Sequence, residues 1–273
     1  MEAALTRRAA VAGQFYPGDP MRLRTVVRDH MAASGVAPAP DATAVIIAPH
    51  AGYPYSGPTA GYAYRRIQGK APKRVVLLGV SHRYALDKAS VYSAGSFETP
   101  VGTFPVDSEF AGALAKETDS PGVEPHRLEH SLEVQLPFLE AAVGAVPIAP
   151  VLFGAPPLEW HAQFGQTLAA MVDKDDLLVI STDLSHFLGE EDANTIDQAS
   201  IQAVLAGDWA RFAQGACDGR FSMCGAAAVT AGMSYALAQG ADRWRLLDYR
   251  TSARATGDRS RVVGYAALSM EWP

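Results

Sequence analysis

Continuous apolar runs that end in polar residues dominate the hydrophobic pattern of this chain. VIIAPH ends at His50, VVLLGVSH ends at His82, and LLVISTDLSH leads into Asp183 and His186. A strand that is covered on both faces loses its polar alternation, so these runs predict buried strands of a parallel sheet. The carboxyl ends of such strands line the crevice where ligands bind in open α/β sheets. The pattern therefore predicts a functional site at this edge.

Strands and helices alternate along the whole chain, with no low-complexity linker and no internal repeat. Strands are expected at 44–48, 74–80, 90–92, 145–153, 177–181, 244–250 and 261–268. Helices are expected at 21–33, 59–67, 108–117, from 129 onward, at 158–172, 190–205, 208–214 (with Asp208 as N-cap) and 224–237. This order predicts a single α/β domain over 1–273, with three layers, a largely parallel central sheet and helices on both faces. The last two strands would form an antiparallel hairpin at the sheet edge.

The composition of the chain disfavours some classes of binding partner. The chain has 273 residues, 48% hydrophobic and 19% charged, with a net charge of -6. This balance fits a globular protein with a sizeable core and argues against nucleic acid, which needs a basic face. No apolar run is long enough to span a membrane, and the N-terminus lacks the apolar stretch of a secretory signal. We therefore expect a cytoplasmic protein with no membrane partner.

His50 and His82 stand at corresponding places. Pro49 ends the strand ladder and Gly52 allows a tight turn, which places His50 on a loop tip facing the crevice. VVLLGVSH repeats this geometry for His82, on what we expect to be the neighbouring parallel strand. Each histidine can be a metal ligand or can simply cap a turn.

Further candidates are carboxylates and a histidine. Asp183 and His186 are three residues apart and share a face if the chain turns helical there. His186 suits a ligand or a general acid/base, and Asp183 could orient a ligating imidazole. The alternative is an N-cap aspartate beside a packed histidine. Glu129 or Glu133 could bind metal or neutralise charge, or belong to an ordinary helix start.

Three further histidines, His30, His126 and His161, lie in contexts that suggest the surface, and they receive no role. The aromatic residues after His50 either wall a pocket or pack in the core. No Walker A loop, no G-x-G-x-x-G after a strand and no G-x-S-x-G elbow occurs, which disfavours nucleotide binding and α/β-hydrolase chemistry.

Two cysteines, Cys217 and Cys224, are too few for a disulfide framework, and their spacing matches no zinc motif. Cys224 precedes an Ala-rich helix, whose N-terminus would favour the thiolate. A buried, inert thiol is the alternative. With His50 and His82 at strand ends, a thiolate ligand is the stronger hypothesis, and two imidazoles with one thiolate suit zinc, iron or copper.

Seven segments, in order, resemble the Memo-like family, whose prokaryotic members are called AmmeMemoRadiSam system protein B. They cover nearly the whole chain and read PHAGYPYSGPTAGYAY, GVSHRY, ETPVGTFPVD, EHSLEVQLPFL, STDLSH, MCGAAA and TGDRSRVVGYAA. The resemblance implies a fold similar to LigB-like class III extradiol dioxygenases, which are nonheme-iron enzymes. It also implies a functional link to an AMMECR1-like protein and a radical-SAM enzyme. Eukaryotic members are described as adaptors that bind phosphotyrosine peptides.

The resemblance implies a pocket of five residues, which fall on His50, His82, Asp183, His186 and Cys224. Iron or copper is expected on the two histidines and the cysteine. Extradiol dioxygenases complete their triad with a carboxylate, so the thiolate puts ring cleavage in doubt.

Our leading hypothesis is an α/β metalloprotein that performs iron- or copper-dependent redox chemistry on an unknown small substrate. His50, His82 and Cys224 would be the ligands, and Asp183 and His186 would handle protons or orient substrate. One alternative is a LigB-like dioxygenase, which needs a carboxylate ligand such as Glu133 or Asp183. A second is a non-catalytic module that binds a peptide or other ligand, for which a basic residue such as Arg83 would suit an anion. A zinc-dependent hydrolase is a further option.

Overall fold

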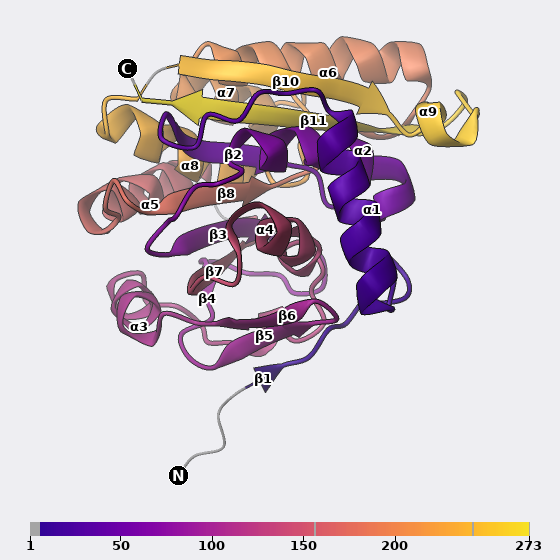
Figure 1. Ribbon diagram of the computed structural model, residues 1–273. Coiled ribbons are helices and arrows are strands. Elements are labelled where there is room, and N and C mark those ends of the chain that lie inside the picture. Colours follow the sequence, from indigo (N-terminus) through magenta and orange to yellow (C-terminus); the bar gives the residue numbers. More distant parts are fainter. Residues whose placement is uncertain (1–5, 156, 242, 273) are drawn as a thin grey trace.

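The structure is a computed structural model that describes residues 6–155, 157–241 and 243–272. Its main sheet has the strand order β10-β11-β2-β8-β3-β7-β4 (Figure 1). The four central strands run parallel to one another. They are β2 (Thr43–Ala48), β8 (Leu177–Ser181), β3 (Val75–Val80) and β7 (Ile148–Phe153). Every residue of β2, β7 and β8 is buried, as the apolar runs predict for strands covered on both faces.

The two edges of this sheet are antiparallel, so the sheet is mixed rather than purely parallel. β11 (Val262–Glu271) runs antiparallel to β2, and β10 (Arg243–Thr251) pairs with β11 at the edge. At the other edge, β4 (Ser90–Val91) runs antiparallel to β7. The closing hairpin is therefore confirmed.

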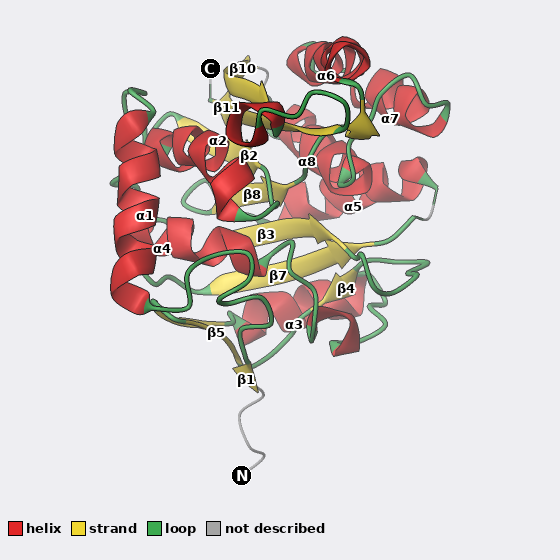
Figure 2. Cartoon of the chain, turned by 90° about the vertical axis from the view of Figure 1, so that its right-hand side faces the viewer, coloured by secondary structure: helices red, strands yellow, loops and turns green. Residues whose placement is uncertain are grey.

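Helices cover both faces of the sheet, as expected (Figure 2). On one face, α2 (Tyr53–Arg66) contacts β2 and β11 and is covered by α1 (Pro20–Ala33) and α4 (Leu136–Val143). On the other, α8 (Ala226–Ala238) contacts the central strands and packs on α5 (Leu158–Met171). The remaining helices lie farther from the sheet centre: α3 (Ser108–Glu117), α6 (Glu190–Leu205), α7 (Trp209–Cys217) and α9 (Ala253–Thr256).

Two glycines let α8 approach its neighbours closely. A Cβ on Gly232 would lie 2.2 Å from Cδ1 of Ile180 in β8. A Cβ on Gly165 of α5 would lie 2.2 Å from the carbonyl oxygen of Ala231 in α8. A side chain at either position would have to displace these atoms, so α8 packs closely on β8 and on α5.

Two expected helices differ in the structure. α2 begins at Tyr53 rather than at 59, because Pro54 suits the first turn and the helix continues through Pro58. The segment from Glu129 is not a continuous helix, since the Glu129 carboxylate accepts the backbone N–H groups of the two following residues. A 3₁₀ turn (Glu133–Gln135) precedes α4 instead.

Short strands were also missed. The stretch around residue 100 forms a hairpin of β5 (Ser96–Thr99) and β6 (Gly102–Pro105), with β1 (Thr6–Arg7) parallel to β5. The segment after Asp183 does not turn helical. His186 instead starts β9 (His186–Leu188), which pairs with the beginning of β11.

Candidate metal centre

Three parallel strands bring their carboxyl ends to one place. His50 follows β2, His82 follows β3, and Ser181 is the last residue of β8. β8 lies between β2 and β3, so the expectation that the two histidines follow neighbouring strands is wrong. The His50 side chain contacts the end of the intervening strand through Ser181.

Two sets of potential ligands lie within 4.8 Å of one another among the described residues. The first is His50, His82 and Cys224. Nε2 of His50 is 3.2 Å from Sγ of Cys224, and the rings of His50 and His82 are nearly perpendicular, with centroids 5.1 Å apart. Cys217, at the exposed end of α7, belongs to neither set. The structure thus gathers the two imidazoles and one thiol that the sequence singles out, and their role as ligands stays a prediction.

The hydrogen bonds of Ser181 determine the tautomer of His50. The Ser181 hydroxyl donates to the carbonyl of Ser131 at 2.6 Å and accepts from Nε2 of Gln135 at 2.8 Å. Its remaining contact, 2.9 Å to Nδ1 of His50, therefore requires Nδ1–H to be the donor. Nε2 then carries the lone pair and faces Cys224, as a metal ligand would.

Glu129 gives His82 and His130 the same orientation. Its buried Oε1 lies 2.9 Å from Nδ1 of His82 and 3.2 Å from Nδ1 of His130. A carboxylate accepts hydrogen bonds, so both rings present Nδ1–H to it and leave Nε2 as the free acceptor. The two rings stack with centroids 4.6 Å apart. No role for His130 is predicted from the sequence, in which its position next to Glu129 is the only signal of one.

The second potential ligand set is His82, Glu129 and His130. Glu129 already accepts the backbone N–H groups of His82, His130 and Ser131. Burial raises the pKa of Glu129, but hydrogen bonding and electrostatic attraction to His82, together with the backbone N–H groups, outweigh burial and lower it to about 2. This saturated anion acts as the orienting partner of two imidazoles rather than as a ligand itself.

Cys224 and His50 are both held neutral. Burial, followed by the negative charge of Asp183, raises the pKa of the Cys224 thiol to about 12. The expected effect of a helix N-terminus is therefore outweighed, and α8 starts only at Ala226. Burial, and then the charges of His130 and His82, keep the pKa of His50 well below its ordinary value. Nε2 of His50 carries no proton and lies 3.2 Å from Sγ, so it can accept the thiol proton, which a bound cation would replace.

Asp183 does not orient an imidazole, contrary to expectation. Its buried carboxylate accepts the backbone N–H of His50 at 2.7 Å, and its own N–H donates to Sγ of Cys224 at 3.2 Å. Asp183 thus ties the loop after β2 to the loop before α8. Burial raises its pKa to about 7, although hydrogen bonds from the backbone of His50 and Ala51 oppose this shift.

His186 stands on the open side of the centre. It is exposed, whereas His50 is 1% exposed. Partial desolvation, and then the charge of His82, lower the pKa of His186. Since the side chain of His82 is also one-third exposed, the centre is accessible to solvent from the side of His82 and His186.

Glu133 is not a ligand. Its buried carboxylate forms an ion pair with Arg7 at 2.5 Å and accepts hydrogen bonds from Tyr16 and from the backbone of Ala10 and Val11. It anchors the N-terminal segment to the core.

The surface placement expected for the remaining histidines is wrong. His126 is 1% exposed, His161 is fully buried, and His30 is half-buried.

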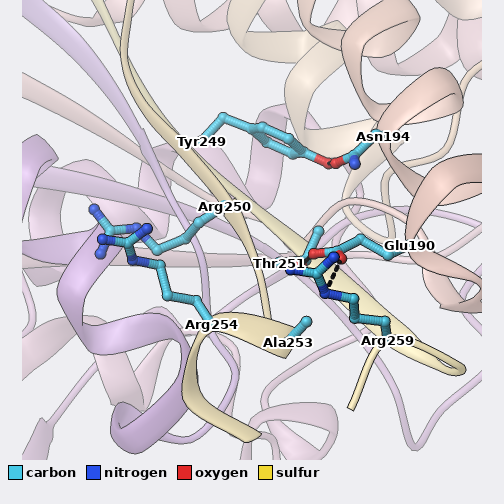
Figure 3. A pocket seen from close by; sticks show the side chains of 8 residues that line it. All are labelled: Glu190, Asn194, Tyr249, Arg250, Thr251, Ala253, Arg254 and Arg259. Carbon is cyan, nitrogen blue, oxygen red and sulfur yellow. Dashed lines mark hydrogen bonds and ion pairs between the residues drawn. The ribbon is translucent and has the colours of Figure 1, made fainter. Parts of the chain in front are cut away.

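A hollow of about 300 Å³ has a lining that includes none of the clustered histidines (Figure 3). Arg250, Arg254 and Arg259 line it together with Glu190, which pairs with Arg259 at 3.2 Å. None of the five predicted site residues lines it.

The central parallel strands, with a polar cluster at their carboxyl ends, define an α/β protein of the class that binds ligands at this edge. Comparison with known sequences then identifies the family. The sequence model of the family described as Memo-like protein matches residues 7–269. The chain therefore belongs to the Memo-like family.

Curated relatives match over nearly their whole length. A MEMO1 family protein of Methanopyrus kandleri is 34% identical over 97% of this chain and 98% of the relative. One from Aquifex aeolicus is 36% identical over 96% of this chain and 98% of the relative. The solved structure of an uncharacterized protein from Escherichia coli K12 has a TM-score of 0.51 at 14% identity, covering 83% of this chain and 99% of that one. That likeness shows the fold alone. No helix in the described part of the chain is long and apolar enough to cross a bilayer.

Proposed function

We propose that this protein is a metal-dependent redox protein that holds one iron or copper ion on His50, His82 and Cys224 and acts on a small substrate. The observation that carries the proposal is the approach of these three donors to within 4.8 Å of one another. Both imidazoles donate Nδ1–H to oxygen and direct Nε2 to the centre, which is the arrangement of ligating histidines in proteins. A thiolate with two imidazoles suits iron, copper or zinc.

Bound iron or copper would supply one-electron chemistry. The chain's own residues would bind and orient the substrate and move protons. His186 fits this role because it is exposed to solvent and its lowered pKa leaves the ring neutral at pH 7, able to accept a proton. Asp183 has a pKa of about 7, so its buried carboxyl group can hold or release a proton between His50 and Cys224.

Metal titration tests the ligand assignment. Cys224→Ser should lower the affinity for Cu(I) or Fe(II) far more than Cys217→Ser, because only Cys224 lies with the two imidazoles. The measurement is a competition titration with a chromophoric chelator on protein purified without a metal-binding tag. Equal losses in the two variants would refute the ligand assignment.

A second substitution separates an enzyme from a module that only binds. His186→Ala should leave metal content intact and slow metal-dependent turnover by about 10²–10⁴-fold, the range for a lost general acid or base. Metal stoichiometry and oxygen or reductant consumption are measured together. If the variant loses its metal, His186 is a ligand. If the metal-loaded wild type consumes neither oxygen nor reductant, the binding module replaces our proposal.

One observation favours a second candidate, a ring-cleaving dioxygenase of the extradiol type. His82, Glu129 and His130 supply two histidines and a carboxylate, the donor types of its triad. Glu129 would first have to give up its backbone and imidazole hydrogen bonds, so this candidate ranks below the thiolate centre. Loss of metal in Glu129→Ala but not in Cys224→Ser would favour it.

A further inference from the structure

Phe187 occupies an unusual backbone position directly after His186. In the pairing of β9 with β11, His186 lies opposite Val263 and Leu188 lies opposite Val262, which leaves Phe187 as the extra residue of a β-bulge. Its φ is 62°, in the left-handed region that bulky side chains rarely adopt. Bulges and strained residues of this kind concentrate at binding and catalytic sites, where they redirect side chains.

The bulge brings two side chains together that a regular strand would direct to opposite faces. The rings of His186 and Phe187 have centroids 5.8 Å apart, although they belong to consecutive residues. Phe187 thus accompanies His186 on the open side of the metal centre. Its side chain is 62% exposed, which leaves a large apolar surface in solvent at this place.

A cation lies over the same ring. The guanidinium carbon of Arg261, the residue directly before β11, lies 5.2 Å from the centroid of the Phe187 ring, within the range of a cation–π contact. The structure records no ion pair between Arg261 and any described carboxylate, whereas Arg259, two residues earlier, pairs with Glu190. Arg261 therefore offers an uncompensated positive charge beside an exposed apolar ring.

We propose that Phe187 and Arg261 form a recognition site, on the open side of the metal centre, for a small carboxylate that carries an apolar body. The ring would bury the apolar body and the guanidinium would pair with the carboxylate, since it presents planar donors to that group. The inference rests on the proposed function, because it names the substrate class of the same site.

The test uses three probes that separate charge from apolar contact: hexanoate, acetate and 1-hexanol. Their affinities for the full-length protein are measured by ligand-observed NMR titration. Hexanoate should bind about fivefold more tightly than acetate, as expected when one or two methylene groups are buried. It should bind about threefold more tightly than 1-hexanol, the effect of one exposed ion pair.

Two substitutions remove the two halves of the site. Phe187→Asn keeps a residue that tolerates the left-handed backbone and should reduce hexanoate affinity to that of acetate. Arg261→Gln should reduce it to that of 1-hexanol. If the asparagine variant does not fold, Phe187→Gly supplies the same measurement with a residue that adopts this φ freely.

The Phe187 and Arg261 substitutions each have a matched control. Arg259→Gln removes an exposed arginine from the same segment, and Leu237→Asn removes an apolar side chain that is 59% exposed at the end of α8. Both should bind hexanoate as the wild type does. The proposal is overturned if the wild type does not prefer hexanoate over both other probes, if the Phe187 and Arg261 variants retain that preference, or if the controls lose it equally.

The same titration on Cys224→Ser keeps this inference separable from the proposed function. Hexanoate should bind to that variant within about twofold of wild type, because neither Phe187 nor Arg261 depends on the thiol. Failure of the wild type to bind iron or copper would refute the metal centre and leave the hexanoate result to decide the recognition site.

Discussion

At the scale of single residues, the centre depends on which ring nitrogen of each histidine carries the proton. His50 donates Nδ1–H to Ser181, and His82 and His130 donate to Glu129. All three therefore present Nε2 as an acceptor. A single buried carboxylate fixes two of these rings, so its charge should matter more than its size.

Glu129→Gln tests this dependence. The amide is isosteric but neutral, and whichever carboxylate oxygen becomes NH₂ can no longer accept the N–H groups that donate to it: Oε1 accepts from the His82 ring, His130 and Ser131, and Oε2 accepts from the backbone of His82. Metal affinity should fall by about 10–100-fold, the usual cost of losing a partner that orients a ligand. Chelator competition measures the affinity. Glu124→Gln, which removes an exposed carboxylate on the same segment, should leave it unchanged, and a similar loss in both variants would contradict the argument.

Proton release tests the thiol. With a pKa of about 12, Cys224 is protonated at pH 7 in the metal-free protein, and a thiol must lose its proton to become a ligand. Binding of one metal ion should therefore release about one proton, and affinity should rise with pH. Calorimetric titrations in buffers of different ionisation enthalpy count the protons. Cys224→Ser should release none, and equal release from both proteins would show that the proton comes from another group.

The sequence predicts His50 and His82 because each ends a continuous apolar run, and Cys224 because it precedes an Ala-rich helix, which is local information. It does not predict His130, because the role of His130 arises from Glu129 meeting His82 across 47 residues of chain. It also misassigns Asp183, whose contacts are with backbone and thiol groups rather than with an imidazole. Long-range hydrogen bonds of this kind have no periodic signal.

At the scale of elements, long buried strands and amphipathic helices follow from their patterns, and short elements do not. β8 and α3 have the predicted bounds because apolar runs and cap residues mark both ends. β9 has three exposed residues and exists only through its pairing with β11, so no burial pattern could reveal it. The same element carries His186 and Phe187.

Gly225 packs the start of α8 against the end of β8, next to Cys224 of the candidate metal centre. Its N–H donates to Thr182, and a Cβ at this position would lie 2.8 Å from the carbonyl oxygen of Ser181. Gly225→Ala should therefore push α8 away from the end of β8, destabilise the protein by about 1–3 kcal/mol and weaken metal binding through Cys224.

The matched control is Gly112→Ala, in the middle of α3. A Cβ there meets nothing within 4 Å, so alanine should stabilise the protein by about 0.5–1 kcal/mol and leave metal binding unchanged. Urea unfolding measures both free energies. If both alanines have the same effect, close contact at Gly225 does not constrain the structure.

At the scale of the whole molecule, buried polar groups join segments that are distant in the chain. Glu133 binds the N-terminal segment through Arg7 and Tyr16. His126 joins three segments: its carbonyl accepts from Nε of Arg7 at 2.9 Å, and its Nε2 lies 3.0 Å from the carbonyl oxygen of Ser90. Since that carbonyl can only accept, Nε2 carries the proton of a neutral ring.

Stability should therefore fall with acidification through His126. Burial lowers the pKa of His126 to about 3 in the folded protein, against about 6.5 in the unfolded chain. Between these values the unfolded state binds more protons, so the free energy of unfolding decreases as pH falls from about 6.5 towards 3.

Urea unfolding at pH 7 and pH 5, in wild type and in His126→Gln, isolates this contribution. Glutamine cannot titrate but can still donate to Ser90. The wild type should lose about 2 kcal/mol more than the variant between the two pH values, because the unfolded histidine gains a proton over 1.5 pH units below its ordinary pKa. The other histidines contribute to both proteins and cancel in the difference. Parallel losses in the two proteins would mean that His126 is protonated as readily in the fold as in the unfolded chain, and that the buried junction of these three segments tolerates its charge.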